Sequence, residues 1–375
     1  MNGQVAARTT TWHLALGRLG DSQCTPLCAL EVEGWRSTAE GGGAHGCRVW
    51  LTALPRSRPR LLRRSSAAHN HKEDRALNDD LPIRYIEPVY RPPSEADSLI
   101  LPVTDGCSWN KCSFCEMYSP PHKRFRARDQ AEVLTSIRLC GERLGDSVRR
   151  VFLADGDALA LPTRSLMGYL SAIRQHLSAV RRVSSYCLAR NLRKKSLQEL
   201  RELRDLGLER VYLGAESGDD TVLARVNKGE TFESTREALD KLGAAGIRRS
   251  VMILNGLGGV ALSRLHAENS ARLINATQPE YLSTLVVMLA DGGARYRERW
   301  PDWQPLGQDG LLAEMEMFLS ALELRRTIFR ADHASNWLVL KGTLGADKAR
   351  LLQQVRAAIT RPEAAPLRAA WMRGL

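Results

Sequence analysis

Short apolar runs alternate with amphipathic stretches between residues 98 and 288 of this chain. The runs have the length of buried strands and predict strands at 98–104, 149–154, 181–187, 209–214, 247–254 and 281–288. The intervening stretches carry apolar residues at helical spacing and predict helices near 128–143, 163–177, 195–206, 232–245 and 260–275. Six strands separated by helices indicate an α/β fold of parallel β/α units.

Units of this kind cross over right-handed and bring the carboxyl end of every strand to one rim. Six of them make about three quarters of the eight-stranded barrel that such units build. Beyond residue 305 the alternation stops, and helical patterns follow near 310–325 and 346–359. We therefore predict a TIM-like partial (β/α)6 barrel over residues 81–305, and a C-terminal helical region over 306–375 that closes it.

Residues 1–80 carry no sustained strand or helix period. Three successive glycines, scattered tryptophans and an arginine-rich run (56–64) predict a disordered or weakly ordered extension. Cys24, Cys28 and Cys47 have no patterned elements around them that would hold a second metal cluster. The segment also lacks the long apolar run of a secretory signal.

The composition limits the kinds of partner that we expect this chain to bind. The formal net charge is +12, but the excess is spread thinly, and no lysine-rich tract is interleaved with aromatic residues. This favours a solvated basic surface over a nucleic-acid site. No apolar run approaches the roughly 18 residues of a membrane span, so no membrane association is expected. Eight cysteines, three of them clustered, fit a reducing, cytoplasmic compartment, and Cys140 and Cys187 are predicted to be buried apolar residues.

The clustered thiols are those of Cys107, Cys112 and Cys115, directly after the first predicted strand. Thiolates are soft ligands, and one loop can wrap three of them around an iron-sulfur cluster. A [4Fe-4S] cluster held by three cysteines has one iron free to bind another molecule, as a catalytic site requires. The alternative is a structural zinc ion, for which His122 is the nearest fourth ligand.

The stretch from Cys107 to Cys115 resembles the cluster loop of radical S-adenosylmethionine (SAM) enzymes, in which an aromatic residue such as Phe114 commonly precedes the third cysteine. It departs from the usual pattern in having four residues, not three, between the first two cysteines. The segments 91–96 and 117–118 resemble a poorly characterised branch related to the Elp3, MiaB and NifB group. The likeness extends from about residue 83 to the C-terminus. It implies a [4Fe-4S] cluster whose open iron is chelated by the amine and carboxylate of SAM, and an acidic electron donor such as a flavodoxin or ferredoxin, which a basic surface would attract.

The resemblance also implies cofactor contacts at the strand ends. Asp155, Gly156 and Asp157 follow the second predicted strand, where the family has a glycine-rich segment that receives the methionine amine. The two carboxylates supply acceptors, and the glycine permits close backbone approach. An Asp-Gly pair is also an ordinary turn, which is the structural alternative.

After the fourth predicted strand, the resemblance implies that Glu216 or Ser217 contacts the ribose or amine of SAM, and that Lys228 contacts its carboxylate. The structural alternative makes Ser217 a helix N-cap and Lys228 a solvated helix end. Further candidates for cofactor contact are Phe114, Ser185, Arg190 and Met252.

Tyr118, close behind the cysteines, and His333, within the polar segment 329–337, are the candidates for contact with the substrate. A lone histidine is more often structural. The resemblance implies reductive cleavage of SAM to a 5′-deoxyadenosyl radical that takes hydrogen from an unknown small-molecule or peptide substrate. Two alternatives remain, a tRNA-modifying methylthiotransferase and a non-catalytic zinc or iron-sulfur protein. The first of these is expected to carry an additional cluster domain and an RNA-binding barrel, and neither pattern is visible.

Overall fold

The computed structural model describes residues 81–374, so the predictions for the N-terminal extension and its three cysteines lie outside the described residues. The main sheet has eight strands in the order β1-β4-β5-β6-β7-β8-β9-β10. Neighbouring strands are parallel except for β9 and β10, which are antiparallel. The strands are β1 (Leu99–Pro102), β4 (Arg150–Ala154), β5 (Arg182–Cys187), β6 (Leu208–Glu216), β7 (Arg248–Asn255), β8 (Tyr281–Val286), β9 (Thr327–Ala331) and β10 (Leu340–Leu344).

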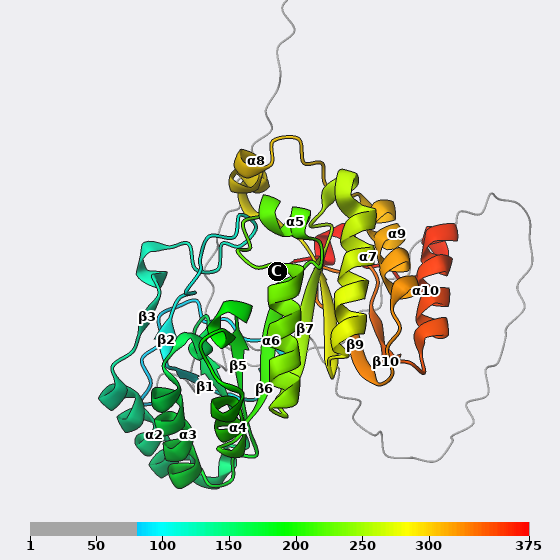
Figure 1. The fold of residues 1–375 in the computed structure, drawn as a ribbon. Coiled ribbons are helices and arrows are strands. Elements are labelled where there is room, and N and C mark those ends of the chain that lie inside the picture. Colours follow the sequence, from blue (N-terminus) through cyan, green and yellow to red (C-terminus); the bar gives the residue numbers. More distant parts are fainter. Residues whose placement is uncertain (1–80, 375) are drawn as a thin grey trace, which may run out of the picture. The chain divides into compact units, whose positions relative to one another are not determined.

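The longer helices follow one another across one face of this sheet (Figure 1). They are α2 (Gln130–Leu144), α3 (Thr163–His176), α4 (Leu197–Asp205), α6 (Phe232–Ala244), α7 (Gly259–Thr277), α9 (Gln308–Ala321) and α10 (Lys348–Thr360). Two short helices, α5 (Asp220–Arg225) and α8 (Ala294–Arg299), lie in connections between strands. Short 3-10 helices occupy Pro93–Glu95, Pro121–Lys123, Gly145–Ser147, Ala158–Ala160, Ala189–Leu192, Ala290–Gly293, Pro362–Ala364 and Ala370–Met372.

Local sequence fixes where several helices begin. The Asp129 side chain accepts the Glu132 amide at the start of α2. Ser196 and Glu199 form a reciprocal capping box at the start of α4. Both arrangements satisfy backbone N–H groups that have no partner inside the helix.

Alternation along the strands divides the buried apolar residues between the two faces of the sheet. One face packs under the helices and carries Val151, Leu153, Val211 and Val251. The opposite, inner face carries Phe152, Tyr186 and Tyr212, whose rings meet edge to face with centroids 5.1 to 6.2 Å apart. Successive strand residues point to opposite faces, so this division decides which side chains can reach a ligand on the inner face.

A buried polar network lies near the amino ends of the strands. Glu95 has no exposed surface and accepts hydrogen bonds from the Ser98 hydroxyl at 2.6 Å, the Tyr212 hydroxyl at 2.5 Å and the Arg182 guanidinium at 3.0 Å. Burial alone would raise the pKa of Glu95, but these donors hold it below its ordinary value. The segment preceding β1 is thereby tied to β5 and β6.

The six predicted strands are confirmed, with ends shifted by a few residues. The first ends at Pro102, and Thr104–Asp105 form a separate strand, β2, paired with β3 (Arg126–Ala127). Both helices expected after residue 305 are present as α9 and α10, and two strands that the sequence analysis did not predict, β9 and β10, extend the sheet there. Residues 81–374 all fall within one compact unit. In this described part of the chain, no helix has both the length and the apolar character needed to cross a membrane.

Candidate cluster and cofactor site

The three clustered cysteines lie in a loop, residues 107–118, that we call the cysteine loop. It follows β2 at the carboxyl end of β1, and Gly106 sets its entry with φ +72°. A Cβ atom on Gly106 would lie 2.0 Å from the Lys123 carbonyl oxygen, so only glycine fits there. At the far side of the loop, the Arg295 guanidinium of α8 donates to the Cys115 carbonyl at 3.1 Å.

The thiols of Cys107, Cys112 and Cys115 are unpaired by disulfides and partly exposed. Burial raises the pKa of all three, that of Cys112 to about 12. Neighbouring thiols raise the pKa of Cys112 and Cys115 further, and the Asp157 carboxylate raises that of Cys107. The ammonium of Lys228 lowers the pKa of all three. The Lys228 ammonium thus acts on all three thiols, while burial keeps the pKa of each above its ordinary value.

The segment after β4 is hydrogen-bonded to the end of the cysteine loop. The Tyr118 hydroxyl donates to Asp155 at 3.0 Å and accepts the Gly156 amide at 3.1 Å. The buried ammonium of Lys123 donates to the other oxygen of Asp155 at 2.6 Å. Burial and the neighbouring carboxylate raise the pKa of Tyr118, so the phenol stays protonated and remains a donor.

Asp157 and Gly156 contact the start of the same loop. The Asp157 carboxylate accepts the backbone amide of Ser108 at 3.0 Å, the Ser108 hydroxyl, and the side-chain amide of Asn191 at 3.2 Å. A Cβ atom on Gly156 would lie 1.7 Å from the Gly106 carbonyl oxygen. The close approach that this glycine permits is thus to the backbone of the cysteine loop.

The end of β6 carries a buried ion pair. The register with β7 shifts between Gly214 and Glu216, and Glu216 has a left-handed backbone with φ +64°. This conformation turns its carboxylate back over Gly214, where a Cβ atom would lie 2.0 Å from the Glu216 oxygen. The Lys228 ammonium lies 3.0 Å from Glu216 Oε1 and 5.9 Å from the centroid of the Phe114 ring. Burial alone would lower the pKa of Lys228, but the Glu216 charge raises it, so the ammonium stays charged.

A family model described as the radical SAM superfamily matches residues 101–267, the stretch that runs from β1 through the cysteine loop into α7. This part of the chain is similar to the radical SAM superfamily. A curated relative, GTP 3′,8-cyclase from Paracoccus denitrificans (strain Pd 1222), is 26% identical over 206 residues, which cover 54% of this chain and 55% of the relative. The chain thus spans about half the length of this relative.

Solved structures are also similar to this chain, at low identity. The coproporphyrinogen III oxidase HemN from Escherichia coli is 16% identical with a TM-score of 0.46, covering 60% of this chain and 52% of HemN. The archaeal Elp3 from Methanocaldococcus infernus is 15% identical with a TM-score of 0.41, covering 61% of this chain and 59% of that protein. The relation of this chain to the Elp3, MiaB and NifB group stays a prediction.

Radical SAM enzymes use an iron-sulfur cluster and SAM, and the residues present fit such a cluster. Three soft donors share one loop, and the two other described cysteines, Cys140 and Cys187, are confirmed as buried core residues. His122, the fourth ligand of the zinc alternative, is exposed and its ring contacts the Glu87 carbonyl at 3.3 Å. Among residues 81–374, no three His, Cys, Asp or Glu side chains form a ready site for a metal ion.

Two predicted cofactor contacts are not brought to the site. Ser185 lies on the helix-facing side of β5 together with Cys187, and its hydroxyl donates to the Leu153 carbonyl at 3.1 Å. Its neighbour Tyr186 occupies the inner face instead. Ser217 is fully buried and its hydroxyl pairs with His266 of α7 at 2.8 Å. The period of two along a strand gives each residue a face, and sequence alone does not say which face is the inner one.

The structural alternatives for the β6 end also differ from what is observed. The N-cap of α5 is Asp219, not Ser217, because Asp219 accepts the Val222 amide at 3.0 Å. Lys228 is buried and paired, not a solvated helix end.

The other predicted residues are distributed around the site. Met252 is partly exposed on β7, in register with Gly214. Arg190 stacks on the cysteine loop through Trp109, with its guanidinium carbon 3.8 Å from the ring centroid. His333 lies in the loop after β9, where its Nδ1 pairs with the Ser335 hydroxyl at 2.9 Å, and burial together with the charge of Arg368 lowers its pKa. The hydrogen bonds of its ring are therefore with Ser335 of its own loop and not with the cysteine loop.

Sequence reasoning missed Lys123, Trp109 and Asn227, each of which contacts the cysteine loop or its supports. The four-residue spacing between Cys107 and Cys112 was a signal in the sequence that pointed to Trp109, which lies within it.

Proposed function

We propose that this chain binds a [4Fe-4S] cluster through Cys107, Cys112 and Cys115 and uses it to cleave SAM reductively. When bound, the cluster and SAM would supply a 5′-deoxyadenosyl radical that takes a hydrogen atom from the substrate. The observation that carries this proposal is the presence of three thiols within one loop, all under the electrostatic influence of Lys228 from the buried pair of Glu216 and Lys228. The protein would contribute binding, orientation and exclusion of water.

The charges of the site suit the methionine end of SAM. The Lys228 ammonium, held cationic by Glu216, would receive a carboxylate, and the Glu216 carboxylate would accept an ammonium. Phe114 and the partly exposed Met252 would supply apolar contact to the nucleoside. Glu216 and Lys228 pair with each other at 3.0 Å, so an amino acid bearing both charges could satisfy both members of the ion pair.

The carboxylates of Asp155 and Asp157 have a different role in this proposal. Both already accept hydrogen bonds, from Tyr118 and Lys123 in one case and from Ser108 in the other. We infer that they hold the cysteine loop in place, and that any contact of this segment with SAM comes through its backbone carbonyls. His333 is not assigned a role with the substrate, because its ring already pairs with the Ser335 hydroxyl of its own loop.

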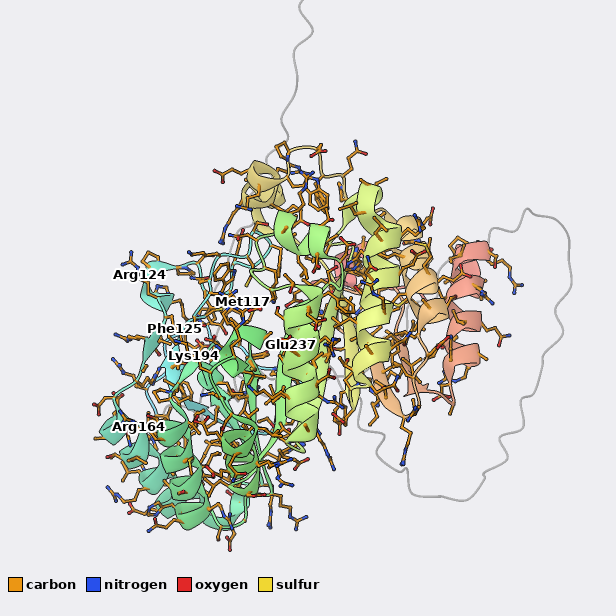
Figure 2. The ribbon with its side chains drawn as sticks, in the orientation of Figure 1. Met117, Arg124, Phe125, Arg164, Lys194 and Glu237 are labelled. Atoms are coloured by element: carbon orange, nitrogen blue, oxygen red, sulfur yellow. The ribbon has the colours of Figure 1, made fainter. Side chains whose placement is uncertain are left out.

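We infer that the electron donor is an acidic protein such as a flavodoxin or ferredoxin. The net charge of +12 favours such a partner. Figure 2 shows Arg124 and Phe125 at the outer edge of the segment that follows the cysteine loop, where Phe125 is 38% exposed. Lys111 of the loop itself is also exposed. The substrate, a small molecule or a peptide, is not specified by these features.

The direct test is substitution of one cluster cysteine. We expect Cys112→Ala to abolish release of 5′-deoxyadenosine from SAM after anaerobic reconstitution and reduction with dithionite, since the remaining two thiols would not hold the cluster. The matched control is Cys140→Ala, because Cys140 is buried in α2 and belongs to the core. Undiminished release from the Cys112 variant would refute the proposal.

A further inference from the structure

The four residues between Cys107 and Cys112 include Trp109, whose side chain leaves the cysteine loop and docks on the segment after α5. Its indole Nε1 donates to the Asn227 carbonyl at 2.8 Å. Gly229, with φ +70°, lies directly against the ring, and a Cβ atom there would be 2.4 Å from the Trp109 carbon Cζ2. A side chain at position 229 would therefore displace the indole.

Arg190 holds the indole from a second element. Its guanidinium carbon lies 3.8 Å from the ring centroid, within the range of a cation–π contact. The Nε of Arg190 donates to Glu230 Oε1 at 2.8 Å, which fixes the guanidinium over the ring. Glu230 is itself buried and follows Gly229 directly, so ring, guanidinium and carboxylate form one connected unit.

Two further hydrogen bonds join the cysteine loop to the same segment. The Ser113 amide donates to the Val226 carbonyl at 3.0 Å. The Asn227 side chain, on a left-handed backbone with φ +53°, donates to the Lys111 carbonyl at 3.1 Å. This segment also carries Lys228, whose ammonium pairs with Glu216. The three thiols and the Lys228 ammonium thus lie on two segments that are joined by hydrogen bonds.

We propose that Trp109 is a positioning residue that fixes the cysteine loop against the segment carrying Lys228, so that the thiols and the Lys228 ammonium keep one geometry. The inference rests on the proposed function, in which the thiols hold the cluster and Lys228 binds SAM. The wide spacing between Cys107 and Cys112 supplies the extra chain that brings Trp109 to Asn227. Loss of one hydrogen bond and one cation–π contact should weaken the docking of the cysteine loop on this segment by about tenfold.

The first experiment measures SAM binding by equilibrium dialysis, with iron content, on the anaerobically reconstituted full chain. We expect Trp109→Ala to bind SAM about tenfold more weakly with iron content unchanged, since all three thiols remain. Trp109→Phe, which keeps an aromatic face, should recover part of the affinity, and Trp371→Ala, at a tryptophan that is 84% exposed, should match the wild type. Wild-type affinity in Trp109→Ala, or no recovery in Trp109→Phe, would overturn the proposal.

The second experiment uses the metal-free chain, so that it does not depend on the cofactors. We expect hydrogen exchange of the Ser113 amide to be about tenfold faster in Trp109→Ala and intermediate in Arg190→Lys, which keeps the charge but loses the planar face. An unchanged exchange rate of the Ser113 amide in Trp109→Ala would overturn the positioning role of Trp109. Failure of the wild-type protein to hold iron or SAM would instead overturn the proposed function, while this measurement would still decide the role of Trp109.

Discussion

The contact between Gly156 and the cysteine loop leads to a quantitative prediction for Gly156→Ala. Gly156 has φ +79°, a conformation that residues with a side chain adopt at a cost. Its added Cβ atom would lie 1.7 Å from the Gly106 carbonyl oxygen and 3.0 Å from the Cys107 amide nitrogen. Both are backbone atoms at the entry to the cysteine loop, so the start of the loop must move to relieve the overlap.

Two costs add in this variant. A left-handed backbone at a non-glycine residue costs about 1–2 kcal/mol, and an overpacked contact that forces a backbone shift costs about 1–3 kcal/mol more. We expect Gly156→Ala to lower the free energy of unfolding by about 2–5 kcal/mol. Because Cys107 is the first ligand of the proposed cluster, we also expect the variant to retain less iron after reconstitution.

Gly207→Ala is the control, because Gly207 also has a positive φ, +113°, but no atom lies within 4 Å of its added Cβ. It should show the backbone cost alone and keep its iron. Urea unfolding of the metal-free chain and iron analysis of the reconstituted protein measure the two effects. Equal destabilisation of the two variants, with equal iron content, would refute the role of Gly156 in seating the cysteine loop.

Other substitutions test the remaining contacts by the same urea assay. Lys228→Met leaves the buried carboxylate of Glu216 uncompensated and should cost about 3–5 kcal/mol, most of which Glu216→Gln in the same chain should restore; an additive double variant would contradict the pairing. Tyr118→Phe removes the acceptor of a backbone amide and the donor to Asp155, and should cost about 1–3 kcal/mol; a neutral effect would contradict those bonds. Glu95, whose pKa is lowered on folding, stabilises the protein above its ordinary pKa of 4.5, and this contribution is lost as the pH falls. Glu95→Gln should therefore weaken the loss of stability as the pH falls below 4.5, and an unchanged pH dependence in that range would contradict the role of Glu95 in the network.

The elements that sequence predicted well are those whose signal is local. Six strands are apolar runs of the right length, and their helices carry regular amphipathic spacing. The three cysteines fall within nine residues, so their shared role needed no tertiary information. β9 escaped prediction because polar residues occupy two of its five positions, Thr327 and Arg330, and only alternate side chains are buried.

Contacts between distant segments account for the rest of what was missed. Ser185 and Tyr186 are adjacent in β5, and only the packed helices reveal which of the two faces inward. Lys123 looks like a surface residue in a basic stretch, yet it is buried and paired with Asp155. Trp109 meets Gly229 across 120 residues of sequence, a contact that no local pattern encodes.

The central claim is that three cysteines of this chain hold an iron-sulfur cluster with one iron left open for SAM. The most direct test is the electron paramagnetic resonance spectrum of the reduced, anaerobically reconstituted protein, recorded before and after addition of SAM. The account predicts a cluster signal, from about four iron per chain, that changes when SAM is added. A single bound zinc ion without a cluster signal, or a cluster signal that SAM leaves unchanged, would contradict it.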